Sequence, residues 1–276
     1  MNCASSLSIW QVDAFAAKVF EGNPAAVVSI EGSWPSDQVL QAIAAENNLS
    51  ETAFARLDVN PVPLRWFTPT IEVPLCGHAT LAVAAVMHVE LGMVHNGSTV
   101  EFATASGPLH VRVDGDSYVL DLPGRPCVPS SMLVDRVQQA LGTSMLELWE
   151  SVDRYVCVLR DEVAVRNLRP DMTSIVGLSL PGLVVTARGE TSDFVSRYFA
   201  PAKGVPEDPV TGTSHCTLAP FWGRRLGKTR LLAHQLSHRG GRIDCVVQGD
   251  RVHLTGQCRI YLQGFIDVST ARPPNI

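Results

Sequence analysis

The sequence predicts an α+β fold of two similar halves, each with a curled β-sheet around one buried helix. Two helical segments, which begin at Gly77 and Gly212, are apolar on nearly all sides. A helix without a polar face is buried on all sides. Short segments with strand patterns fill most of the remaining chain, and the residues at the two helix starts resemble each other. Similarity of this kind inside one chain indicates two related halves.

The length of 276 residues fits two domains of ordinary size. The densest cluster of proline and glycine lies at 123–129 and marks the boundary between them. We expect this connection to be exposed. The predicted first half covers 1–122 and is completed by a C-terminal strand at about 262–276, and the predicted second half covers 130–261.

In the first half, apolar residues alternate with polar ones as they do in half-buried strands. The turn at Gly22–Pro24 separates the first two strands, and Ser36 is placed to cap the first helix. Gly92 is suited to end the second helix. The expected strands are Leu7–Phe15, Ala25–Ile30, Thr52–Leu57, Leu64–Phe67, Ser98–Thr104, Leu109–Val113 and Tyr118–Leu122, and the expected helices are 36–47 and 77–92.

In the second half, apolar residues with helical spacing from Leu133 to Leu141 are followed by Gly142, which predicts a short helix. Pro220 lies inside the helix that begins at Gly212, and we expect it to kink that helix because it removes one backbone hydrogen bond. The expected strands are Tyr155–Leu159, Leu183–Ala187, Phe194–Phe199, Arg230–Gln235, Arg242–Gln248, Arg251–Leu254 and Arg259–Phe265.

Charge and composition exclude several classes of partner. The net charge is −5 and the chain has no long run of Lys or Arg, which argues against a nucleic-acid or anionic-membrane surface. No apolar stretch is long enough to cross a bilayer, and the first residues do not have the pattern of a signal peptide. The seven cysteines lack paired spacing. We therefore expect a cytoplasmic protein with reduced thiols.

The chain has no motif for a metal or a cofactor. Its histidines are not spaced as metal ligands usually are. His234 and His238 are four residues apart, which would suit a helix, but they lie in a stretch with the pattern of a strand. It contains no phosphate-binding or dinucleotide-binding glycine motif and no Gly-x-Ser-x-Gly elbow. We expect neither a metal nor a cofactor.

Both buried helices begin with a glycine, which suits an anion-binding site. The first backbone N–H groups of a helix have no partner within it, and the helix dipole favours negative charge there. Two such helix starts that faced each other would hold a small acid from both sides. The alternative is that the glycines only allow tight turns. The similar segments are Cys76–Ala82, preceded by Glu72 and Pro74, and Thr211–Ala219, preceded by Asp208 and Pro209.

Five segments in order resemble the phenazine-biosynthesis PhzF-like family, and together they cover most of the chain. They are Val12–Phe15 with Phe20–Val28, Asn48–Phe54, Arg65–Pro69, Glu72–Thr80 and Glu207–Ser214. The resemblance implies the diaminopimelate epimerase-like fold, with two pseudo-symmetric halves and the active site between them. This agrees with the two halves inferred from the residues.

By this resemblance, Glu51 occupies the position of the family's catalytic carboxylate. In the family this group moves a proton between carbons of a small cyclic acid without a cofactor. Such chemistry needs a carboxylate that can take and return a proton in a closed cleft. The alternative is an ordinary exposed glutamate in a loop. The expected ligand is a small carboxylic acid, and a homodimer is compatible with the resemblance.

The other site residues also come from the resemblance. His78 and Asp208 match positions that bind substrate and help proton transfer, although a helix-capping histidine and a turn-forming aspartate are the simpler alternatives. Gly77, Gly212 and Thr213 match the helix-start positions that hold the substrate carboxylate. Thr213 stands where the phenazine enzymes usually carry serine, so its extra methyl group narrows the site.

Cys76 leaves a second enzymatic interpretation open. In related epimerases and racemases, paired cysteines at the starts of the two buried helices act as acid and base. Here the second position is Thr211, which cannot ionise near neutral pH and so argues against a symmetric two-thiol racemase. A one-thiol dehydratase or epimerase of an amino or hydroxy acid is the alternative, and so is a small buried thiol without a role. A binding protein that retains the fold without catalysis is the third interpretation, and the presence of Glu51, His78 and Asp208 argues against it.

Overall fold

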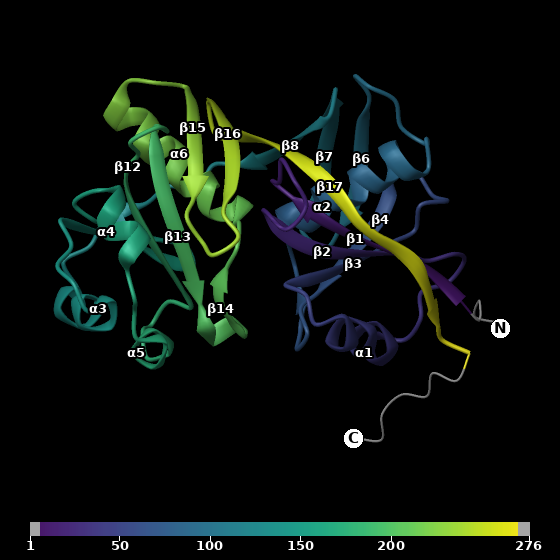
Figure 1. Cartoon of the computed structure of the whole chain (residues 1–276), viewed down its shortest axis with the longest axis horizontal. Coiled ribbons are helices and arrows are strands. Elements are labelled where there is room, and N and C mark those ends of the chain that lie inside the picture. Colours follow the sequence, from purple (N-terminus) through teal and green to yellow (C-terminus); the bar gives the residue numbers. More distant parts are fainter. Residues whose placement is uncertain (1–5, 270–276) are drawn as a thin grey trace. The chain divides into compact units, whose positions relative to one another are not determined.

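The computed structural model describes residues 6–269, and the chain divides into two compact units (Figure 1). The first unit ends at Asp121 and resumes at Thr255, and the second unit is Leu122–Leu254. The chain thus returns to the first unit at Thr255 rather than near 262. The parts of the predicted first half that fall on 1–5 and 270–276 lie outside the described residues.

The first unit is a sheet with one buried helix and one covering helix. Strand β2 pairs antiparallel with β1 and parallel with β3, β4 pairs antiparallel with β3, and β17 pairs antiparallel with β1. The elements are β1 (Ser6–Ala14), β2 (Asn23–Ser29), α1 (Asp37–Asn47), β3 (Glu51–Ala55), β4 (Val62–Phe67), β5 (Glu72–Val73), α2 (Gly77–Ala85), β6 (Thr99–Thr104), β7 (Gly107–Asp114), β8 (Ser117–Pro123) and the end of β17 (Arg251–Asp267).

Helix α2 is the buried helix of the first unit. All nine of its residues are buried, and it packs against β1, β2, β3 and β7. It continues into a π-helical turn at Val86–Glu90. The apolar pattern of the sequence predicted this burial, because a helix with strands around it has no side for water.

The second unit has the same kind of architecture, with helices on both faces of its sheet. Its elements are β9 (Val128–Pro129), α3 (Val134–Leu141), β10 (Glu147–Ser151), β11 (Arg154–Val158), α4 (Glu162–Asn167), α5 (Met172–Val176), β12 (Gly182–Arg188), β13 (Phe194–Ala200), β14 (Val205–Asp208), α6 (Gly212–Leu226), β15 (Arg230–Gln235), β16 (Gly241–Gln248) and the start of β17.

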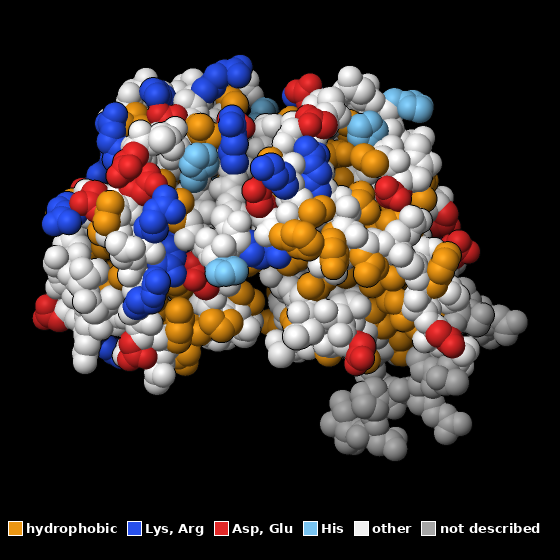
Figure 2. Space-filling view, viewed as in Figure 1, with side chains coloured by type: hydrophobic (Ala, Val, Ile, Leu, Met, Phe, Trp, Pro, Cys, Tyr) orange, Lys and Arg blue, Asp and Glu red, His pale blue; other side chains and the backbone are white. Residues whose placement is uncertain are grey.

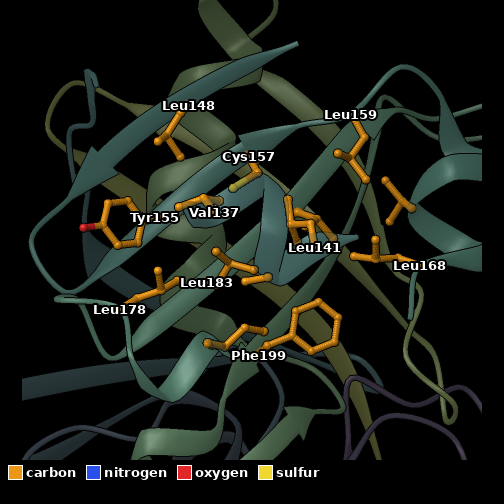
Figure 3. Packing of buried hydrophobic residues seen from close by; sticks show 14 of the residues in the cluster. Val137, Leu141, Leu148, Tyr155, Cys157, Leu159, Leu168, Leu178, Leu183 and Phe199 are labelled. Carbon is orange, nitrogen blue, oxygen red and sulfur yellow. The ribbon is translucent and has the colours of Figure 1, made fainter. Parts of the chain in front are cut away.

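The two faces of this second sheet are covered by different helices. On one face, Tyr155, Leu183 and Phe199 form a core with residues of α3, α4 and α5 (Figure 3). On the other face, Trp222 of α6 donates from Nε1 to Oγ1 of Thr186 at 2.9 Å. Successive strand residues point to opposite faces of a sheet. Thr186 of β12 therefore faces α6, and its neighbours in the strand face the core on the other side.

The two units repeat one topology. In each, an antiparallel strand pair (β1–β2 and β10–β11) is followed by a helical crossover to a parallel strand (β3 and β12). An antiparallel strand, a short strand and the buried helix come next, as β4, β5 and α2 in one unit and as β13, β14 and α6 in the other. The similarity between the helix starts is therefore part of an internal repeat.

One ion pair recurs at the same place in both units. Arg65 donates from Nε and Nη2 to the carboxylate of Glu72 at 2.8 and 2.7 Å. Arg197 donates from the same two nitrogens to Glu207 at 2.7 and 2.9 Å. Glu72 therefore corresponds to Glu207. The sequence comparison matched Glu72 with Asp208, and this was wrong. Asp208 is the residue that follows the paired glutamate, one position closer to the buried helix.

The last strand differs from its prediction. Two strands were expected at Arg251–Leu254 and Arg259–Phe265, but β17 is continuous over Arg251–Asp267 (Figure 1). Gly256 lies in the gap that the prediction left between these two strands. A Cβ added at Gly256 would lie 2.3 Å from Cδ1 of Phe15, so the glycine allows the strand to pass close to that ring.

The proline-rich connection is less exposed than predicted. Its prolines are exposed, but Cys127 is buried and the Gly124 N–H donates to the Asp250 carbonyl at 2.7 Å. The Arg125 N–H donates to the Cys216 carbonyl at 2.9 Å. That carbonyl is the one that Pro220 cannot bond, so the connection supplies the missing donor and α6 continues past the proline to Leu226.

Figure 2 shows apolar side chains gathered on the face of the first unit that β17 crosses. Phe20, Tyr261, Leu262 and Phe265 are exposed large apolar residues of this region. None of the described helices is both long and apolar enough to span a bilayer. Six cysteines are free and buried, and Cys3 lies outside the described residues.

Candidate active site

Three predicted site residues meet at the start of α2. Glu51 is the first residue of β3, directly after the turn that ends α1, and His78 is the second residue of α2. Cys76 stands at the N-cap position of α2. One ligand atom from each of the three lies within 4.8 Å of the others. The fold therefore brings together residues that are up to 27 positions apart in the chain.

His78 lies in the middle of this cluster. Its Nε2 is 3.4 Å from Oε2 of Glu51, and its Nδ1 is 3.5 Å from Sγ of Cys76 and 3.2 Å from Nδ2 of Asn23. Burial lowers the pKa of His78 to about 3, so the imidazole is neutral near pH 7. Because the Asn23 amide donates to Nδ1, the single ring proton is on Nε2, on the side of Glu51.

The Glu51 side chain is 16% exposed, while that of His78 is 5% exposed. The carboxylate is therefore mostly enclosed but within reach of a ligand. A neutral N–H beside one carboxylate oxygen orients the group without giving it a permanent cationic partner. This arrangement suits a group that takes and returns a proton.

The same three side chains are of types that bind metal ions, and one ligand atom from each lies within 4.8 Å of the other two. His78 has Glu51 on the side of Nε2 and Cys76 on the side of Nδ1. Sequence spacing did not reveal this cluster, because its members come from a strand and from a helix start.

The second group of predicted residues lies at the start of α6, in the second unit. Asp208 ends β14, Thr211 stands at the N-cap position of α6, and Gly212 and Thr213 are the first two helical residues. Thr211 donates from Oγ1 to Oδ2 of Asp208 at 2.5 Å. The hydroxyl at the N-cap therefore fixes the carboxylate that precedes the helix.

Gln235 holds this turn in place from β15. Its side chain is fully buried, its Oε1 accepts from the Thr211 N–H at 2.9 Å, and its Nε2 donates to the Asp208 carbonyl at 2.7 Å. His215 donates from Nδ1 to the Thr211 carbonyl at 2.8 Å, and burial lowers the pKa of His215 to about 4. Gln235 thus ties the helix start to β15, and His215 binds back to it from within α6.

The structure therefore forms two groups of the predicted site residues, one in each unit. Glu51, Cys76, Gly77 and His78 belong to the first unit, and Asp208, Thr211, Gly212 and Thr213 belong to the second. That the two groups act on one ligand stays a prediction.

Sequence reasoning missed two positioning residues. Asn23, which is fully buried and contacts His78, was interpreted only as part of the turn at Gly22–Pro24. Gln235 was interpreted only as the end of a strand. A buried amide in a short polar turn and a buried glutamine at a strand end are the signals that point to such roles, because buried polar groups need partners.

Comparison with known proteins gives consistent results. A family model described as phenazine biosynthesis-like protein matches residues 12–264. A Pseudomonas aeruginosa protein described as an uncharacterized isomerase is 48% identical, over 94% of this chain and 98% of its own length. The crystal structure of a phenazine biosynthesis protein of the PhzF family from Enterococcus faecalis has a TM-score of 0.86 at 42% identity, and it covers 95% of this chain and 99% of that chain.

More distant structures share the fold. A hydroxyproline epimerase from Agrobacterium vitis has a TM-score of 0.63 at 11% identity, over 98% of this chain and 94% of that chain. At this identity the similarity concerns the fold alone. Together with the repeated topology, these comparisons confirm the predicted α+β, diaminopimelate epimerase-like fold.

Proposed function

The chain belongs to the phenazine biosynthesis-like family, and we propose that it moves a proton between two carbons of a small carboxylic acid, with Glu51 as acid and base. Curated relatives are described as isomerases, and an isomerase-type activity is the function that this membership supports. The assignment of Glu51 and the class of substrate are our proposal.

The contact between Glu51 and neutral His78 supports the proposal most strongly. In the first step, a C–H bond of the acid breaks, its electron pair moves into the adjacent double bond system, and the proton binds to a Glu51 oxygen. In the second step, the Glu51 O–H bond breaks and the proton binds to another carbon while the double bond shifts. No oxidant or reductant is needed. The N–H of His78 lies beside the ionised Glu51 carboxylate before the first step and after the second, when Glu51 does not carry the substrate proton.

The helix starts supply the proposed binding groups. The first N–H groups of α2 and α6, at Gly77 and Gly212, favour a carboxylate because they lack partners within their helices. Asp208, held by Thr211, is the second carboxyl group that we assign to proton transfer. The substrate would thus be bound through its carboxylate and react at a carbon near Glu51.

A one-thiol dehydratase or epimerase is the second candidate, because Cys76 lies 3.5 Å from Nδ1 of His78. In that mechanism the thiol must lose its proton to become the base. An imidazole with a pKa of about 3 is a poor acceptor for that proton. This favours Glu51 over Cys76 as the base.

The test is a screen of small cyclic and acyclic carboxylic acids with the purified protein in heavy water, followed by NMR and mass spectrometry. The proposal predicts an acid whose carbon-bound hydrogen is replaced by deuterium and whose double bond moves without a change in elemental composition. Loss of one water from the product would favour the dehydratase. Binding of acids without any exchange would favour a non-catalytic binding protein.

A further inference from the structure

A buried arginine lies beneath the start of α6. Arg154, the first residue of β11, is 1% exposed and donates from Nη2 to Oγ1 of Thr213 at 3.2 Å. It also donates from Nε and Nη2 to the carboxylate of Asp153 at 2.7 and 3.0 Å. Its Nη1 is buried and has no hydrogen-bond partner among the described residues. An unused donor on a buried cation is costly, so a function is expected for it.

Positive charge exceeds negative charge around this arginine. Besides Arg154, Arg125 and Lys203 approach the same carboxylate of Asp153, at 3.6 and 3.3 Å. Burial raises the pKa of Asp153, but these three cations together hold it well below its usual range. Three cations therefore share one permanently ionised carboxylate, close to the positive end of the α6 dipole.

The charge of the whole second unit has the same sign. Leu122–Leu254 contains 16 Arg and Lys against 13 Asp and Glu, although the complete chain has a net charge of −5. In the face shown in Figure 2, Lys and Arg side chains are gathered on this unit. A basic unit in an acidic chain favours an anionic ligand on that unit.

The internal repeat places different charged groups beside the starts of its two buried helices. In the first unit, β3 begins at Glu51, which lies beside the second residue of α2. In the second unit, β12 begins at Gly182, whose paired residue across the strands is Arg154. Arg154 contacts Thr213, the second residue of α6. One repeat thus places a carboxylate beside its helix start, and the other places a guanidinium there.

The contact with Arg154 also fixes the role of the Thr213 hydroxyl. A guanidinium has only donors, so the Thr213 oxygen is the acceptor in this contact. The hydroxyl proton of Thr213 is then available to a ligand. Thr211 is different, because its hydroxyl donates to Asp208. Of these two threonines at the start of α6, Thr213 is the one prepared to donate to an anion.

We infer that Arg154 is a positioning residue of a carboxylate-binding site at the start of α6, where it sets the Thr213 hydroxyl as a donor and supplies positive charge. The inference rests on the proposed function only in taking a carboxylic acid as the ligand. It extends that function by adding Arg154 and the Thr213 hydroxyl to the groups that recognise the ligand carboxylate at the start of α6.

The test is a titration of the full chain with benzoate, followed through the backbone amide NMR signals of Gly212 and Thr213. Saturable shifts are expected at both amides. Thr213→Val removes the hydroxyl, and Arg154→Lys keeps the charge but removes the planar guanidinium with its several donors. Each variant should bind benzoate about tenfold more weakly, in line with a lost hydrogen bond to a charged group. Thr213→Ser should restore the affinity.

Three controls make the outcome specific. Arg160→Gln removes an exposed arginine of the same unit and should leave the affinity unchanged. Benzamide, which is neutral, should lose little affinity in the Arg154 and Thr213 variants. His95→Asn, which changes an exposed residue of the first unit, should also leave the affinity unchanged; the titration follows binding alone, which separates this test from that of the proposed reaction.

The inference is overturned by any of three results. One is that benzoate causes no shift of the Gly212 and Thr213 amide signals in the unchanged chain. Another is that Arg154→Lys and Thr213→Val, each measured as a single variant, both bind benzoate as tightly as Arg160→Gln does. The third is an equal loss of benzoate and benzamide binding, which would mean that Arg154 acts only on the structure. Thr213→Val preserves this test if Arg154→Lys does not fold.

Discussion

The Glu51 carboxylate lies 3.4 Å from Nε2 of His78, and the imidazole of this pair is neutral near pH 7. A protonated histidine would favour the ionised form of the carboxylate and oppose its protonation. A neutral one leaves Glu51 able to alternate between its two forms. The relationship depends on burial of His78 by α2 and its surrounding strands, and on the Asn23 amide, which sets the tautomer.

Stability should fall as the pH decreases from about 6.5, because burial lowers the pKa of His215 to about 4. Between pH 6.5 and pH 4 the histidine is protonated in the unfolded chain but not in the folded chain. The stability that the neutral His215 contributes is therefore complete above pH 6.5 and is lost progressively as the pH falls towards 4. His215→Asn keeps a donor for the Thr211 carbonyl and should reduce this slope by up to about 1.4 kcal/mol per pH unit. Urea unfolding at pH 8, 6 and 5 measures the slope.

The matched control for this prediction is His95→Asn, because His95 is exposed. It should leave the dependence on pH unchanged. Equal slopes for His215→Asn and the unchanged chain would show that His215 is not a buried neutral histidine.

Cys76→Ser should retain most of the exchange activity. Serine fits the N-cap position of α2, and in our account the thiol carries no proton. The steady-state rate with the acid identified by the screen measures the effect. A loss of about 100-fold or more would instead assign the base to Cys76, since a serine hydroxyl cannot replace a thiolate.

Gly256→Ala should destabilise the first unit by about 1–3 kcal/mol, because the new methyl group would collide with Phe15. Gly264→Ala, in the same strand, is the control, since no atom lies within 4 Å of a Cβ at that position. Its free energy of unfolding should change by less than about 0.5 kcal/mol. Similar values for the two variants in urea titrations would contradict the close packing at Gly256.

Arg197→Met should cost at least about 1 kcal/mol more than Arg65→Met, although both remove a two-bond contact to a glutamate. Arg197 also donates to the buried carbonyls of Val165 and Leu168, at 3.2 and 2.8 Å, and these would lose a donor. Arg65 has no such carbonyl contacts among its described bonds and is more exposed. Chemical denaturation compares the two, and equal losses would rule out the role of the carbonyl contacts.

Periodicity predicted the long strands and the buried helices, because their patterns extend over enough residues to be distinctive. It missed β10 and β14 and the helices α4 and α5, which have only four to six residues. It left a gap at 255–258 inside β17, where Gly256 is required by the close approach to Phe15 and not by a turn.

The candidate site was predictable only in part. The resemblance led to Glu51 and His78, but the partners that tune them come from elsewhere in the chain. Asn23 reaches His78 across 55 positions, and Arg154 reaches Thr213 across 59. Contacts of this range follow from strand order and register, which a single sequence does not reveal.

The most direct test of the central claim is the rate of carbon-bound hydrogen exchange in heavy water with Glu51→Gln. This change keeps the size and polarity of the side chain and removes the group that takes the proton. Our account predicts that binding and folding stay intact while the exchange rate falls by about 100-fold to 10,000-fold, the usual contribution of a general base. A variant that binds the acid normally and loses only a few-fold in rate would contradict the assignment of Glu51 as the proton carrier.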